Sequence, residues 1–214
     1  MEKYGKKPKK FTVEWYEYIW EYYKLHIIVA VLLVAAVVYT WVSIASAPRY
    51  DLDVCFSLSR NFGDEAKNKL MEELAANVDD IDGNGEVDVN FLDCSVPDGF
   101  DDAEYASSMD SKFYLELQAG DSYIFVVSKD MAERLTKDSA LDGLFEKASE
   151  WSGAEGDFEY FADAGKSEFF RNAGVPADGV YIGIRNFTAG EGSDKDLLKR
   201  QNAVLAAEFI LGNV

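Results

Sequence analysis

The stretch HIIVAVLLVAAVVYTWVSIASA, residues His26 to Ala47, holds no Lys, Arg, Asp or Glu over 22 positions. A helix rises about 1.5 Å per residue, so this stretch reaches about 33 Å, which is enough to cross a hydrocarbon core of about 30 Å. We therefore expect residues 26–47 to form a transmembrane helix that holds the chain in a lipid bilayer.

The charges on either side of this stretch predict its orientation. The first ten residues contain five lysines and one glutamate, and Lys24 lies at the start of the apolar run. Lys-rich segments beside a span stay on the cytoplasmic side of the membrane. Residues 48–214 hold 15 Lys and Arg against 35 Asp and Glu, a net charge of −20. The sequence predicts a cytoplasmic amino terminus and an extracellular acidic domain at the cell membrane.

A cleaved secretory signal is the alternative interpretation, because Ala45-Ser46-Ala47 has the small residues of a cleavage site. The apolar run is longer than the roughly 7–15 residues of a signal sequence, and Pro48 follows the site directly. Both features favour a retained anchor. The expected organisation has three parts: a basic tail with an aromatic interfacial helix that begins near Thr12 (1–25), the span (26–47) and the outer domain (48–214).

The outer domain alternates strand and helix patterns in the order β-α-β-α-β, followed by a last strand and a closing helix. Such an order favours a parallel sheet with helical crossovers. The sequence therefore predicts a three-layer α/β domain with a mostly parallel sheet. The expected strands are Tyr50–Ser57, Glu86–Cys94, Ser122–Ser128 and Gly179–Phe187, and the expected helices are Asp64–Val78, Asp101–Gln118, Met131–Thr136, Leu141–Trp151 and Asp194–Leu211.

Several segments between Asp51 and Leu135 resemble the first lobe of type 2 extracellular solute-binding proteins: KLMEELAANV, GEVDVNFLD, LELQAGDSYIFVV and DMAERL. The whole layout also resembles uncharacterised single-pass membrane proteins of Gram-positive bacteria, with a Lys-rich tail and a Tyr-Tyr-Lys approach to the span. The first resemblance implies an α/β fold and a role in binding a solute. The chain is long enough for one lobe and a cap. The sequence therefore does not predict a ligand enclosed between two lobes.

The motif DIDGNGEVD, residues 80–88, resembles the first half of a calcium-binding loop. Oxygen-bearing side chains stand at loop positions 1, 3 and 5 and a glycine at position 6, while Phe91 replaces the glutamate of position 12. Asp79 or Asp93 would have to complete the set of ligands. The alternative is a polar turn between helix and strand. The expected ligands of a structural calcium ion are Asp80, Asp82, Asn84, Glu86 and Asp88.

Cys55 and Cys94 are the two cysteines of the chain, and they lie on the first two expected strands. An oxidising exterior favours a disulfide, and the two thiols can meet if these strands are neighbours. A bridged pair and two free buried thiols both remain open.

The composition argues against catalysis and nucleic-acid binding. The single histidine, His26, lies at the membrane, so the outer domain lacks a histidine for a nucleophile pair or a zinc site. A domain of charge −20 repels phosphate. We expect a non-enzymatic binding or assembly module whose recognition loops are 57–63, 94–102 and 128–130. The alternative is a receptor for a small solute or peptide, which requires a deep apolar cleft near these loops.

Overall fold

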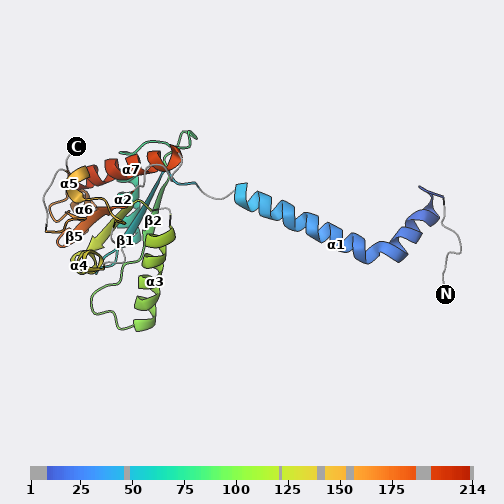
Figure 1. Cartoon of the computed structure of the whole chain (residues 1–214), viewed down its shortest axis with the longest axis horizontal. Coiled ribbons are helices and arrows are strands. Elements are labelled where there is room, and N and C mark those ends of the chain that lie inside the picture. Colours follow the sequence, from blue (N-terminus) through green and yellow to red (C-terminus); the bar gives the residue numbers. More distant parts are fainter. Residues whose placement is uncertain are drawn as a thin grey trace. The chain divides into compact units, whose positions relative to one another are not determined.

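The structure is a computed structural model that describes residues 9–45, 49–120, 122–138, 143–152, 157–186 and 194–212 (Figure 1). The chain divides into two compact units, residues 1–48 and 49–214. The first unit contains the apolar segment, and the second contains a folded α/β domain.

The first unit is built on one helix, α1 (Val13–Ala45), which confirms the expected start near Thr12. Its portion Val13–Ser43 is long and apolar enough to cross a membrane, and none of its apolar window is buried inside the protein. A continuous helix satisfies its own backbone hydrogen bonds, as a segment in lipid must. The helix is compatible with a transmembrane span and, from its place near the amino terminus, with a signal sequence.

The second unit contains one five-stranded sheet with the order β2-β1-β3-β5-β4. β1 lies between β2 and β3 and pairs with both in parallel, whereas β5 pairs antiparallel with β3 and β4. Four of the five strands therefore point the same way, so the predicted mixed α/β fold with a mostly parallel sheet is confirmed. The strands are β1 (Leu52–Ser57), β2 (Val89–Asp93), β3 (Ile124–Ser128), β4 (Ala162–Asp163) and β5 (Val180–Ile184).

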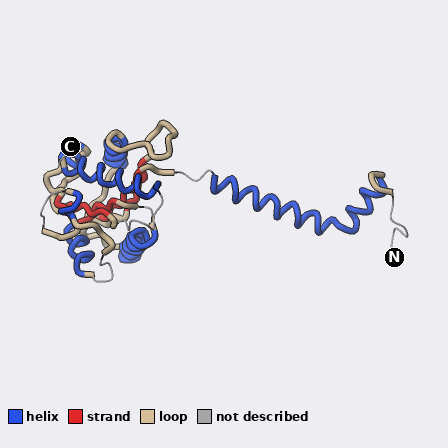
Figure 2. Tube along the Cα trace, turned by 45° about the horizontal axis from the view of Figure 1, so that its top comes forward, coloured by secondary structure: helices blue, strands red, loops and turns tan. Residues whose placement is uncertain are grey.

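The helices of the second unit surround the strands, which lie together in the middle of the domain (Figure 2). The first crossover, α2 (Asp64–Ala75), leads from β1 to β2, and the second, α3 (Ala103–Ala119), leads to β3. Asp102 begins α3 because its carboxylate accepts hydrogen bonds from the N–H groups of Glu104 and Tyr105, both at 3.0 Å. The remaining helices are α4 (Lys129–Lys137), α5 (Ala148–Trp151), α6 (Glu168–Asn172) and α7 (Asp194–Leu211).

Two hydrophobic clusters occupy the two faces of the sheet, because successive side chains of a strand point to opposite faces. On β1, Val54 and Phe56 pack into a cluster that includes residues of α2, α6 and α7, while Cys55 packs with residues of α3 and α4. Accordingly, α7 and α3 lie on opposite sides of the strands (Figure 1). Fully burying an aliphatic or aromatic side chain contributes roughly 1.5–3 kcal/mol, so both clusters stabilise the central strands.

Several element boundaries differ from the sequence prediction. β2 begins at Val89 and not at Glu86, because residues 83–86 donate backbone N–H groups to nearby side chains in a turn. The helix expected at Leu141–Trp151 covers Ala148–Trp151, and residues 139–142 lie outside the described part of the chain. β4 and α6 were not expected, since elements of two and five residues are too short to show a periodic pattern.

Candidate functional site

The carboxyl ends of the parallel strands β1, β2 and β3 meet at one edge of the sheet, which we call the carboxyl edge. The chain leaves β1 for β2 on one side and later crosses to β3 on the other side of β1. Open α/β sheets bind ligands at such a reversal of strand order. The gap between the ends of β1 and β3 is therefore the first place to look for a site.

A cavity of about 230 Å³ lies at this position. Its lining comes from the end of β1, the segment after β2, helix α3, and the junction of β3 with α4. The three segments expected to carry recognition, 57–63, 94–102 and 128–130, each contribute to it. The lining residues are Ser57, Leu58, Ser59, Cys94, Val96, Asp110, Ser128, Asp130, Met131 and Arg134.

Some polar groups in and near the cavity already form hydrogen bonds within the protein, and others do not. Ser128 caps α4 and accepts a hydrogen bond from the N–H of Met131 at 3.4 Å. Near the cavity, the Ser95 hydroxyl accepts from the N–H of Leu58 at 3.1 Å and fixes the chain after β1. Ser57 is only 7% exposed, and its hydroxyl has no hydrogen-bond partner among the described residues. The cavity thus contains a hydroxyl, that of the mostly buried Ser57, that is available to a ligand.

Three charged side chains line the same cavity. Arg134 of α4 reaches Asp110 of α3 with N···O distances of 3.3 and 3.4 Å, and this hydrogen bond raises the pKa of Arg134. Asp130, in the first turn of α4, is exposed, and its charge contributes to the raised pKa of Arg134. The lining therefore carries one more negative charge than positive charge.

Arg60 holds the loop that follows β1. Its guanidinium donates to the carbonyl oxygens of Pro176 and Asp178, the latter at 2.7 Å, in the turn before β5. Two charge-assisted hydrogen bonds from one guanidinium fix direction as well as distance. This contact ties the loop beside the cavity to a segment more than 100 residues further along the chain.

The two cysteines lie beside one another, and one of them lines the cavity. Cys55 is on β1, Cys94 directly follows the neighbouring strand β2, and both are free and buried. The hydrogen bond from Cys55 to Cys94, together with burial, raises the pKa of Cys55, and the same bond lowers the pKa of Cys94. Cys94 lines the cavity and Cys55 does not, so Cys94 is the thiol that a ligand can reach.

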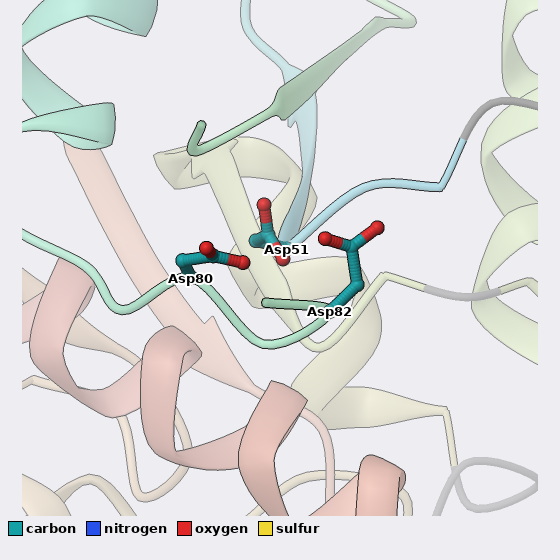
Figure 3. A group of neighbouring side chains, drawn as sticks. All are labelled: Asp51, Asp80 and Asp82. Atoms are coloured by element: carbon teal, nitrogen blue, oxygen red, sulfur yellow. The ribbon is translucent and has the colours of Figure 1, made fainter. Parts of the chain in front are cut away.

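An acidic cluster lies at the opposite edge of the sheet, where the parallel strands begin, which we call the amino edge. Asp51 precedes β1, and Asp80 and Asp82 come from the segment before β2 (Figure 3). Carboxylate oxygens of the three residues lie within 4.8 Å of one another, a spacing that can hold a metal ion. Two of the five predicted ligands are therefore brought together, and Asp51 joins them.

The carboxylates of this cluster already accept backbone hydrogen bonds. The Asp51 oxygens accept from the N–H groups of Ile81 and Asp88, both at 2.9 Å. The Asp80 oxygens accept from Gly83 at 2.7 Å and from Gly85 at 2.8 Å, and these bonds, that from Gly85 first, lower the pKa of Asp80. Both glycines have positive φ angles, 72° and 91°, which the turn requires.

The other predicted ligands lie outside the cluster. The Asn84 side chain accepts from the N–H of Glu86 at 2.7 Å, while Glu86 and Asp88 are exposed. Asp93 cannot complete a calcium site with Asp80, because it ends β2 at the carboxyl edge and pairs there with Lys67 at 2.8 Å. Sequence reasoning missed Asp51, although its position just before a parallel strand was a usable signal, since the amino ends of neighbouring parallel strands also meet.

Comparisons with protein-family models, with curated proteins and with solved structures gave no match to this chain. The likeness of residues 51–135 to solute-binding proteins therefore stays a prediction from the sequence, and the function has to be argued from the two edges of the sheet.

Proposed function

We propose that this chain is a single-pass membrane protein that presents a non-enzymatic binding module outside the cell. Residues 26–47 anchor it, the amino terminus is cytoplasmic and residues 48–214 are extracellular. The observation that supports binding most is the cavity between the ends of β1 and β3, whose lining includes Ser57, a mostly buried residue with a hydroxyl that bonds to no described residue. A three-layer arrangement is part of the proposal, and the hydrophobic clusters on the two faces of the sheet support it.

A membrane-tethered solute receptor is the second candidate, and the size of the cavity favours it over assembly with another protein. Drug-sized ligands occupy pockets of roughly 300–1,000 Å³, so a cavity of about 230 Å³ fits a smaller molecule. The lining mixes serine and charged groups with apolar ones, which differs from the deep apolar cleft expected of a receptor. The cavity suits a small polar solute better than an extended peptide.

A topology experiment tests the anchor and its orientation. The full chain carries a carboxyl-terminal epitope tag, and protease is added to intact cells and to lysed cells. We expect the tag to be lost in intact cells while the amino-terminal tail remains protected, as the positive-inside rule predicts. Protection of the tag in intact cells contradicts the orientation, and recovery of the outer domain in the medium contradicts the anchor.

A thermal-shift screen tests the binding module. Full-length protein in lipid nanodiscs is melted with a library of small polar solutes, because a ligand that binds the native state raises its melting temperature. Ser59→Trp fills the cavity and should abolish the shift. Ser107→Trp, at an exposed position of α3 outside the cavity, is the matched control and should keep it. A library without any shift contradicts the proposal, and a shift that survives Ser59→Trp places the site elsewhere.

A further inference from the structure

We propose that the cavity binds a small molecule that carries an α-ammonium group beside a carbonyl or carboxylate oxygen. Free amino acids and the first residue of a peptide share this chemistry. The inference rests on the proposed binding function, because it names the ligand class of the same cavity. Four features of the cavity carry it: an unbonded hydroxyl, a free helix N–H group, one more carboxylate than guanidinium in the lining, and the available volume.

The Ser57 hydroxyl is the first feature. Ser57 ends β1, lines the cavity and is 93% buried, yet its hydroxyl bonds to no residue in the part of the chain that is described. Because Ser57 lines the cavity, its hydroxyl faces space that a ligand or a water molecule can occupy. The neighbouring Ser95 hydroxyl is already bonded to Leu58. Ser57 is therefore free to donate to a ligand oxygen.

The amino terminus of α4 provides a second donor. In its first turn, the N–H of Lys129 bonds to the Gly179 carbonyl oxygen and the N–H of Met131 bonds to Ser128. The N–H of Asp130 lies between them and has no partner within the residues described here. First-turn N–H groups and the helix dipole favour an oxygen that carries negative charge. Together with Ser57, this group can bind a carbonyl or carboxylate oxygen.

The charges of the cavity lining favour a ligand that carries an ammonium group. Arg134 forms an ion pair with Asp110 and also interacts electrostatically with Asp130, so one guanidinium faces two carboxylates. A ligand ammonium group can supply the missing positive charge. A purely anionic ligand would meet the excess negative charge of the lining.

The cavity of about 230 Å³ is smaller than the roughly 300–1,000 Å³ of pockets for drug-sized ligands, so it suits a smaller molecule. A small amino acid is within this size. Leu58, Val96 and Met131 provide apolar contacts for its side chain.

Isothermal titration of the full-length protein in lipid nanodiscs tests this ligand class with four probes. L-alanine and L-alaninamide carry both an ammonium group and the neighbouring oxygen, propionate lacks the ammonium group, and ethylamine lacks the oxygen. We expect the first two to bind at least tenfold more tightly than propionate and ethylamine. Trialanine and its acetylated form separate the two sources of this chemistry. Tighter binding of trialanine than of alanine, abolished by acetylation, indicates a peptide terminus. Tighter binding of alanine indicates a free amino acid.

Two variants and a control connect binding to the cavity. Asp130→Asn and Ser57→Ala should each weaken L-alanine binding at least tenfold. A melting curve of each variant serves to check that it is folded. Glu133→Gln changes an acidic residue of the same helix that does not line the cavity, and it should bind as the wild type does.

The outcomes also separate this inference from the proposed function. The ligand class is wrong if propionate or ethylamine binds as tightly as L-alanine, or if Asp130→Asn has no effect. It is also wrong if none of the four probes binds while another solute of the screen still stabilises the protein and Ser59→Trp abolishes that shift. In that case the proposed binding function is still supported. If no solute of the screen binds, both proposals fail.

Discussion

The two edges of the sheet use polar side chains in opposite ways. At the amino edge, Asp51 and Asp80 accept two backbone hydrogen bonds each. At the carboxyl edge, the Ser57 hydroxyl forms no hydrogen bond within the described part of the chain, and the exposed Asp130 carboxylate shares the Arg134 guanidinium with Asp110. Groups that are already bonded hold the fold, whereas groups left unbonded in a cavity remain available for recognition. The acidic sequence of residues 80–88 is therefore weaker evidence for binding than the less conspicuous serine at the end of β1.

The amino edge is also tied to the last helix. The Asn202 side chain of α7 donates to the backbone oxygens of Asp51 and Asp79, at 3.1 and 2.7 Å, and accepts from the N–H of Asp79 at 3.0 Å. Asn202 is only 1% exposed, so these bonds form away from water, where an unmade bond is costly. One asparagine thus joins α7 to β1 and to the loop before β2.

The largest effect on stability is expected from Asp51→Ala. The substitution leaves the N–H groups of Ile81 and Asp88 without their acceptor, and Asp51 is only 2% exposed. Two lost hydrogen bonds to a charged group cost about 3 kcal/mol in the free energy of unfolding. For a domain of this size, that corresponds to a fall of about 6–12 °C in melting temperature.

The matched control for Asp51→Ala is Asp82→Ala at the same edge, because Asp82 is exposed and its side chain accepts a hydrogen bond from the N–H of the exposed Asn84. Its melting temperature should stay within about 2 °C of the wild type, as is usual for surface substitutions. Equal losses in both variants would show that the amino edge is held by something other than the Asp51 bonds.

The next largest effect on stability is expected from calcium. If the carboxylates of Asp51, Asp80 and Asp82 bind calcium with a dissociation constant of about 0.1–1 mM, 10 mM calcium stabilises the protein by about 1.4–2.7 kcal/mol. The melting temperature should rise by about 3–11 °C. Magnesium at the same concentration is the control, and Asp82→Asn should remove the calcium effect. An unchanged melting curve with calcium would leave the amino edge as a polar turn.

The sequence predicts the fold of this domain better than its sites. An alternating pattern locates β1 and a continuous apolar run locates β3. The amphipathic pattern of 194–211 locates α7 at its observed bounds, because a long helix buries one face. The acidic loop was found from its spacing, but Asp51 was not, because it is 29 residues away in sequence and meets the loop only through strand pairing. The Ser57 hydroxyl had no sequence signal, since an unbonded group is recognised only after its neighbours are placed.

A labelling rate tests whether the carboxyl edge is open to small molecules. Cys94 lines the cavity, whereas Cys55 lies behind it and is fully buried. After reduction, iodoacetamide should modify Cys94 at least tenfold faster than Cys55 in the native protein, because Cys94 also has the lowered pKa. Peptide mapping by mass spectrometry measures both rates. Equal rates would show that labelling requires unfolding and that the cavity does not admit the reagent.

The pH dependence of this rate sharpens the same test. The lowered pKa of Cys94 comes first from its hydrogen bond with Cys55, so alkylation of Cys94 should reach half its maximal rate below pH 9.0, the usual thiol pKa. In Cys55→Ala this donor is absent, and the midpoint should move upward. Cys55→Ser keeps a donor at this position and should keep the midpoint close to that of the wild type.

The smallest effect on the melting temperature is expected at acidic pH, where the Asp80 carboxylate becomes protonated. Backbone N–H groups, that of Gly85 first, stabilise the charged carboxylate and lower its pKa from the usual 3.8. A lowered folded-state pKa contributes stability above the unfolded pKa, and this stability is lost as the pH falls through the folded pKa. The difference in melting temperature between the wild type and Asp80→Asn should therefore be constant from pH 7 to about pH 5 and shrink below pH 4. A difference that instead grows toward low pH would mean that Asp80 is not held in its charged form by the loop.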